Sequence, residues 1–74
     1  MEFIKGEKLK VTKANGDWDG ATMQYKDEID IVTVKKIIRR NGQTRIHVVS
    51  QYGYGYTIIY ETFITRNRCT IEKI

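Results

Sequence analysis

Cationic side chains are concentrated in one short segment of this sequence. Residues 35–45, KKIIRRNGQTR, contain five cations and no acidic residue. These cations are Lys35, Lys36, Arg39, Arg40 and Arg45. Guanidinium groups match the geometry of phosphate oxygens, so a projecting hairpin lined with them suits contact with a nucleic-acid backbone. The alternative is an edge hairpin whose charge only keeps it solvated and prevents aggregation.

Tyrosines gather just after the basic segment, in residues 50–64 (SQYGYGYTIIYETFI). Four of the five tyrosines lie here and share one parity, namely Tyr52, Tyr54, Tyr56 and Tyr60. Rings that face outward would stack on bases, each worth about 1–3 kcal/mol, whereas rings that face inward would fill the core. A small barrel cannot enclose them all. We expect Tyr52 and Tyr54 to be exposed stacking residues, and Tyr60 to be partly buried with Ile58.

A tryptophan lies in an acidic stretch near the N-terminus. Trp18 has an aspartate on each side, and five acidic residues fall within residues 17–30. A groove formed by Trp18, Tyr54 and Tyr56 would suit a protein partner, because the nearby acids repel phosphate. This arrangement favours a protein-interaction module as the alternative to nucleic-acid binding.

No set of residues predicts catalysis, a metal site or a cofactor. His47 falls in the middle of an expected strand without a matching nucleophile and acid, so we expect a structural or solvent-facing histidine. Cys69 alternates with Ile71, which predicts a buried thiol rather than a reactive one. The acids of residues 17–30 lack the spacing of a calcium-binding loop. We therefore expect no enzymatic activity.

The length and composition limit the kinds of protein this can be. Seventy-four residues are enough for one domain, 1–74, and a chain of that size buries only about 60% of its unfolded surface. The net charge of +4 is compatible with a polyanionic partner. One cysteine excludes an internal disulfide and fits a reducing compartment. Without a signal peptide or a run approaching about 20 apolar residues, we expect a soluble cytoplasmic protein with no membrane partner.

The apolar pattern predicts five short strands and almost no helix. Alternation and β-branched residues place these strands at residues 7–13, 28–38, 44–50, 55–61 and 68–74. Residues 14–22, with their Asn-Gly and Asp-Gly pairs, read as a long loop after the first strand. The adjacent Phe63 and Ile64 predict a single helical turn before the last strand.

Two irregularities are expected within the central strands. The parity of the apolar residues changes between Ile31 and Val32, which predicts a β-bulge or sharp bend at that point. Asn41-Gly42 predicts a tight hairpin. Matching the apolar faces on its two sides requires a three-residue loop, with Gly42 in a left-handed or bulged position.

This order of elements resembles the SH3-like barrel superfamily. The corresponding pieces are KGEKLKVTK (5–13) for the first strand, NGDWDGATMQYKDE (15–28) for the long loop, DIVTVKKIIRRNGQTRIHVVS (30–50) for the central hairpin, YGYTIIYETFI (54–64) for the fourth strand with its helical turn, and RCTIEKI (68–74) for the last strand. The opening is also similar to KOW-type modules of ribosomal and transcription proteins, and GYTIIYETF (55–63) is similar to small SH3-like proteins of bacteriophages. The resemblance implies a five-stranded barrel and RNA or DNA binding. The ALYDY-like run of polyproline-binding SH3 domains is absent, so polyproline binding is not implied.

We therefore expect an all-β, non-enzymatic SH3-like barrel that acts as a small binding module. The first hypothesis is a nucleic acid, DNA or RNA, bound by the cations of residues 35–45 with Tyr52 and Tyr54 stacking on bases. The alternative is a protein partner bound at Trp18, Tyr54 and Tyr56, as for a phage-encoded factor that modulates a host protein in the host cytoplasm. Pairing of edge strands would give a weak homodimer, and otherwise the protein is a monomer.

Overall fold

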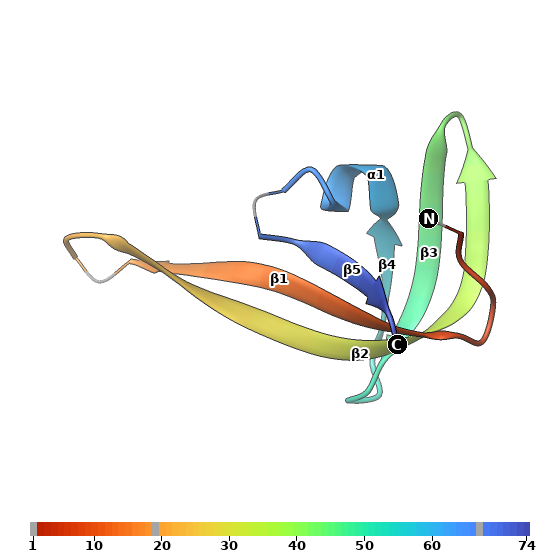
Figure 1. The fold of residues 1–74 in the computed structure, drawn as a ribbon, viewed down its shortest axis with the longest axis horizontal. Coiled ribbons are helices and arrows are strands. Elements are labelled where there is room, and N and C mark those ends of the chain that lie inside the picture. Colours follow the sequence, from red (N-terminus) through yellow and green to blue (C-terminus); the bar gives the residue numbers. More distant parts are fainter. Residues whose placement is uncertain (1, 19, 67) are drawn as a thin grey trace.

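The fold consists of five antiparallel strands and one short helix (Figure 1). The computed structural model describes residues 2–18, 20–66 and 68–74, and the side chains of residues 15, 17, 18 and 25 are outside the description. The elements are β1 (Lys8–Trp18), β2 (Met23–Arg40), β3 (Gln43–Ser50), β4 (Gly55–Ile59), α1 (Tyr60–Phe63) and β5 (Thr70–Lys73). The predicted all-β class and the helical turn before the last strand are confirmed.

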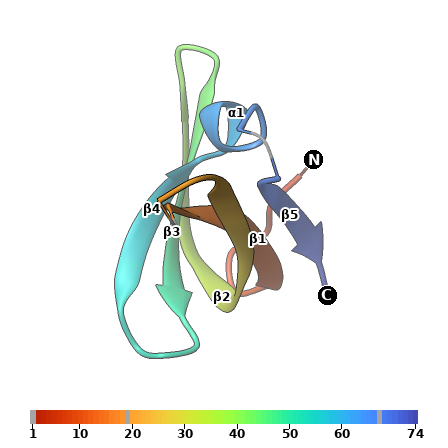
Figure 2. The ribbon, with the colours of Figure 1, turned by 90° about the vertical axis from the view of Figure 1, so that its left-hand side faces the viewer.

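The long strand β2 organises the sheet, whose order is β4-β3-β2-β1-β5. Its residues 23–33 pair with β1 and its residues 32–40 pair with β3, so the two partners overlap only at Val32 and Thr33. Figure 2 shows the sheet curling around this point, with α1 above the opening between the two edges. Within the part of the chain that the structure describes, the edge strands β4 and β5 do not pair with each other. The sheet is therefore open, and it does not close into the expected barrel.

The concave side of this bent sheet holds the hydrophobic core. Nine side chains are buried there, namely Phe3, Leu9, Val11, Val32, Val34, Ile46, Val48, Ile58 and Ile71. Burying each of the larger ones contributes about 1.5–3 kcal/mol to folding. Tyr60 covers the core from α1, where its ring meets Phe3 edge-on at a centroid distance of 5.1 Å. Cys69, predicted to be buried, is only partly buried and is a free thiol.

The hairpin between β2 and β3 has a two-residue turn. Arg40 pairs with Gln43, and Asn41 and Gly42 both have positive φ angles of 53° and 74°. These angles define a type I′ turn, for which Asn-Gly is the preferred dipeptide. The left-handed Gly42 is confirmed, whereas the predicted three-residue loop is wrong.

A bulge in β2 makes the short turn compatible with the core. The β2–β3 register shifts between Val34 and Lys36, which leaves Lys35 without a partner in β3. This extra residue changes the parity of the strand, so Val34 faces the core before it and Ile37 faces the core after it. The bulge predicted between residues 31 and 32 is therefore misplaced. No irregularity is needed there, because Ile29 simply points to the exposed side.

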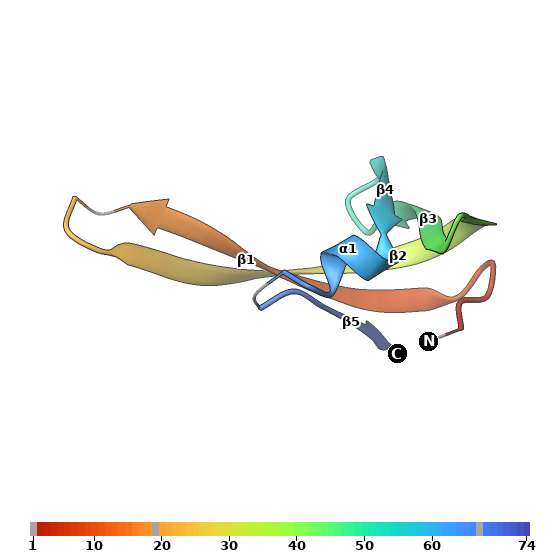
Figure 3. The ribbon, with the colours of Figure 1, turned by 90° about the horizontal axis from the view of Figure 1, so that it is seen from above.

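The predicted long loop after the first strand is a two-stranded arm. Pairing of β1 with β2 continues without interruption from Lys8–Thr33 to Trp18–Met23, well beyond the core (Figure 3). The loop prediction for residues 14–22 is therefore wrong for residues 14–18. Asn15-Gly16 looked like a turn, but Gly16 lies inside the ladder opposite Tyr25. The chain turns instead near Gly20, whose φ of 97° suits a glycine.

Candidate functional site

The residues predicted to bind nucleic acid are divided between the two ends of β3. The five cations lie around the β2–β3 hairpin, while Tyr52 and Tyr54 lie in the loop between β3 and β4 (Figure 1). The turn end of β3, where Arg40 stands opposite Gln43, lies about 25 Å from the loop that carries the tyrosines, at 3.3 Å per residue. Lys36 is closer to the loop, because it stands opposite His47, three residues before Ser50. The structure therefore separates the arginines at the turn from the stacking tyrosines and does not join all seven residues into one compact site.

Three of the five cations share the outer face of the hairpin. Directly opposite residues of an antiparallel pair lie on the same face of a sheet. Three such pairs lie opposite the core side, namely Lys36 with His47, Ile38 with Arg45, and Arg40 with Gln43. We call these six residues the basic face. Among the described residues it contains no carboxylate, and a shallow depression of about 190 Å³ lies between Ile38, Arg40 and Arg45 near the turn.

The two other cations of the segment are placed differently. Lys35 is the exposed bulge residue. Arg39 lies opposite Thr44 on the inner face of the hairpin, on the same side as Glu61 of α1. The Glu61 carboxylate accepts hydrogen bonds from the backbone N–H and the hydroxyl of Thr44, at 2.6 and 2.8 Å. These bonds, followed by the positive charge of Arg39, lower the pKa of the Glu61 carboxyl. The charge of Arg39 therefore acts on an acidic side chain of the protein itself.

His47 completes the basic face. Its Nδ1 lies 2.9 Å from the hydroxyl oxygen of Thr57 on β4, and the ring is partly exposed. This placement agrees with the predicted structural or solvent-facing role. In the described ranges, no group of three or more His, Cys, Asp or Glu side chains could hold a metal ion. Nor is any helix in these ranges long and apolar enough to cross a membrane.

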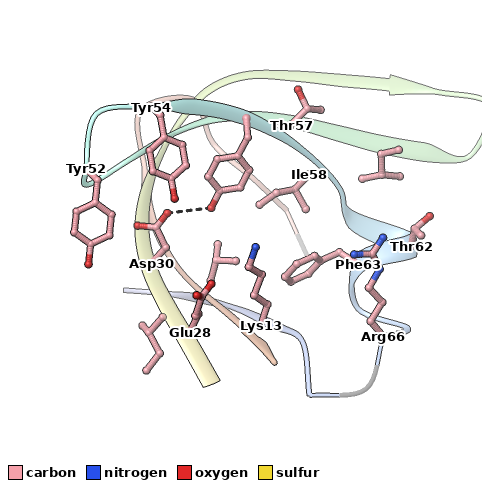
Figure 4. A pocket seen from close by; sticks show the side chains of 14 residues that line it. Lys13, Glu28, Asp30, Tyr52, Tyr54, Thr57, Ile58, Thr62, Phe63 and Arg66 are labelled. Carbon is pink, nitrogen blue, oxygen red and sulfur yellow. Dashed lines mark hydrogen bonds between the residues drawn. The ribbon is translucent and has the colours of Figure 1, made fainter. Parts of the chain in front are cut away.

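A groove of about 690 Å³ lies at the other end of β3 (Figure 4). We call it the aromatic groove. The β3–β4 loop and β4 supply one wall with Tyr52, Tyr54 and Tyr56, and Ile58 and Phe63 supply apolar surface. Its charged lining residues are Lys13, Glu28, Asp30 and Arg66. Residues from both strands of the arm, β4 and α1 therefore converge on one concave surface.

The tyrosines of the groove divide much as predicted. Tyr52 and Tyr54 have exposed fractions of 73% and 56%, so both rings are accessible. Tyr56 is partly buried, and its ring centroid lies 5.8 Å from that of Tyr54. Tyr60 packs against the core as expected, and Ile58 is a buried core residue, 4% exposed, rather than a partly buried one.

A hydrogen-bond network centred on Asp30 fixes the tyrosine wall. The Ser50 hydroxyl donates to Asp30 Oδ1 at 2.9 Å, and the Tyr56 hydroxyl donates to Oδ2 at 3.2 Å. The Ser50 oxygen in turn accepts the backbone N–H of Tyr52 at 3.1 Å. Burial, followed by the negative charge of Asp30, raises the pKa of the Tyr56 hydroxyl well above its usual range. Tyr56 therefore stays protonated and keeps donating to the carboxylate.

Sequence reasoning missed Asp30 and Ser50 as site residues, although a signal was present. Asp30 has the same parity as Val32 and Val34 in an unbroken part of β2, which places it on the concave side. Ser50 likewise shares the parity of Ile46 and Val48 in β3 and is 4% exposed. A carboxylate and a hydroxyl at core-facing positions of neighbouring strands predict a polar pair.

Trp18 was predicted to join Tyr54 and Tyr56 in a partner-binding groove. Its side chain lies outside the described residues, and its backbone pairs with Met23 at the distal end of the arm. Along β1 this position is five residues, or about 17 Å, beyond Lys13 of the aromatic groove. Tyr54 and Tyr56 do lie together in that groove.

Comparison with known proteins identifies no relative: no family model, no curated protein and no solved structure matches this chain.

Proposed function

We propose that this chain is a non-enzymatic binding module whose basic face contacts the phosphate backbone of a nucleic acid. The observation that carries this proposal is the alignment of Lys36, Arg40 and Arg45 on one face of a projecting hairpin. No carboxylate lies among the described residues of that face, so nothing there repels a phosphate. Arginine forks donate two parallel hydrogen bonds to phosphate oxygens.

The shape of the hairpin supports the same function. The type I′ turn at Asn41 and Gly42 holds the two strands together up to Arg40 and Gln43, so the cations extend from a paired backbone. Lys35 at the bulge adds a fourth cation beside Lys36. The tyrosine loop does not belong to this surface, because it lies at the far end of β3 beside Asp30.

We also propose that the fold is an open relative of the small SH3-like barrel. The support is the strand order β4-β3-β2-β1-β5, a long excursion between the first two strands and a one-turn helix before the last strand. In place of the long loop of such barrels, this chain has the two-stranded arm.

The experiment measures fluorescence anisotropy of labelled nucleic acids, either single strands of about 12 nucleotides or duplexes of about 12 base pairs. This length falls within the range of known single-strand site sizes. The test variant is Arg40→Gln/Arg45→Gln, and the control is Lys5→Gln/Lys26→Gln, which removes the same charge from exposed positions outside the basic face. Four phosphate contacts to duplex DNA predict that affinity falls about 150-fold between about 50 and 200 mM salt, and two contacts predict about 12-fold. We expect the wild type and the control to follow the steep dependence, and the test variant to follow the shallow one.

Two outcomes would overturn the proposal. Absence of binding by the wild type to either nucleic acid at about 50 mM salt would remove nucleic-acid binding altogether. Equal losses in both double variants would show attraction by net charge, without a role for this face.

A further inference from the structure

We propose that the aromatic groove is a second binding site, independent of the basic face, and that it takes an arginine side chain from an extended protein segment. The site would consist of Tyr54 and Tyr52 as the stacking surface, with Asp30 and Glu28 as the acceptors. Exposed rings, a fixed carboxylate and the distribution of charge in the groove support this site.

The tyrosine wall offers accessible ring faces in a fixed arrangement. Tyr54 is 56% exposed and rests against Tyr56, which is held by its bond to Asp30. The loop itself is closed by backbone bonds from Ser50 N–H to the Tyr54 carbonyl and from Gly53 N–H to the Ser50 carbonyl, at 2.8 and 2.9 Å. A cation that stacks on such a pre-arranged ring loses little affinity to reorganisation of the protein.

The groove places carboxylates beside these rings. Asp30 Oδ1 and Oδ2 each accept one hydrogen bond from a protein hydroxyl, and each oxygen retains a lone pair for a ligand donor. Glu28 is exposed and makes no ion pair with any described residue. Asp27, by contrast, is already paired with Arg68 at 2.9 Å. The negative charge available to a ligand is therefore that of Glu28 and Asp30.

A guanidinium fits this combination better than the other common ligand groups. It is planar, so it can stack on a tyrosine face while its edge donates to a carboxylate. A phosphate would be repelled by both acids, and an apolar side chain would leave Asp30 without a new donor. Figure 4 shows Asp30 below the ring of Tyr54, with Glu28 farther along the same strand.

The groove also contains positive charge. Lys13 is the direct cross-strand neighbour of Glu28 in the β1–β2 ladder, and Arg66, which follows α1, lies at the end of the groove away from the tyrosines (Figure 4). An acidic residue farther along a bound segment would match Arg66. Lys13 also repels an incoming arginine, so the direction in which its removal changes ligand affinity tests the proposal. Removing the Lys13 charge should tighten an arginine ligand and weaken any anionic ligand.

The test is an NMR titration of ¹⁵N-labelled protein with a capped Gly-Arg-Gly-Gly peptide, in which the guanidinium is the one charged group. The same peptide with citrulline in place of arginine is the neutral control of equal shape. We expect shift changes at residues 28–30 and 52–57, about five-fold weaker binding for Tyr54→Leu and for Glu28→Gln, and about three-fold tighter binding for Lys13→Gln. All three positions are exposed, so these variants should keep the fold.

The outcomes separate this site from the basic face. Arg40→Gln/Arg45→Gln should leave peptide binding unchanged, and Tyr54→Leu should leave nucleic-acid binding unchanged. Equal binding of the citrulline peptide, weaker binding by Lys13→Gln, or flat spectra up to about 10 mM peptide would each overturn the proposal. Loss of nucleic-acid affinity in Tyr54→Leu would also overturn it, because the groove would then belong to the nucleic-acid surface.

Discussion

Removal of one hydroxyl, in Ser50→Ala, should destabilise the protein by about 2–3 kcal/mol. The hydroxyl is buried and donates to the Asp30 carboxylate at 2.9 Å, and hydrogen bonds to charged groups contribute about 1.5–3 kcal/mol. It also accepts the Tyr52 N–H at 3.1 Å, a bond that adds less because water can replace it at this exposed residue. A chain of 74 residues has a total stability of about 4–11 kcal/mol. One hydroxyl would thus account for about a fifth or more of it.

Urea denaturation followed by circular dichroism measures this loss. For a domain of this size the free energy of unfolding changes by about 1 kcal/mol per molar urea, so the midpoint should fall by about 2–3 M. Thr57→Val is the matched control, because it removes an exposed hydroxyl whose one hydrogen-bond partner among the described residues is His47. We expect the control to change the midpoint by less than about 0.5 M.

A double-mutant cycle tests the physical cause. In an Asp30→Asn background the acceptor is neutral, so Ser50→Ala should cost about 1 kcal/mol or less. A Ser50→Ala midpoint within about 0.5 M of the wild type would refute the reasoning. So would an unchanged cost in the Asp30→Asn background, because the charge of Asp30 would then contribute nothing to the bond.

Two further predictions concern α1 and the arm. Hydrogen bonds from Thr44 lower the folded-state pKa of Glu61, so the contribution of this carboxylate to stability is complete above the ordinary value of 4.5 and is lost as the pH falls through the lower folded value. Glu61→Gln should therefore flatten the dependence of the urea midpoint on pH below about 4.5. An unchanged acid dependence would contradict the assignment. Replacing residues 15–26 by Asn-Gly should join Ala14 to Asp27 through a two-residue turn and change stability by less than about 1 kcal/mol, because none of the side chains described in that segment belongs to the core. A variant that fails to fold would show that the arm is required.

The hairpin shows what local sequence can specify. Asn-Gly takes left-handed conformations at both turn positions with little strain, so residues 41 and 42 identify the turn without any knowledge of the fold. The loop length was mispredicted because Ile37 and Ile38 are adjacent and either could face the core. Only the bulge at Lys35 selects Ile37, and nothing in the sequence marks that residue as unpaired.

The arm and the site show what local sequence leaves open. Asn15-Gly16 has the composition of a turn, yet the chain keeps pairing through it and turns near Gly20, because continued backbone pairing outweighs a local preference. The exposure of Tyr52 and Tyr54 followed from the limited interior of a small protein. The separation of Arg39 from the basic face depends on the β2–β3 register, which the turn and the bulge set together.

The bulge at Lys35 has a consequence for how this protein can change. Without Lys35, Lys36 would follow Val34 directly and still stand opposite His47, so all eight β2–β3 pairs would survive its deletion. What would change is the local bend and twist that a bulge imposes on its strand. The direction in which the hairpin points is therefore adjustable by a single insertion or deletion, while the identity of the side chains on each face is preserved. Orientation and composition of this surface can evolve, or be engineered, separately.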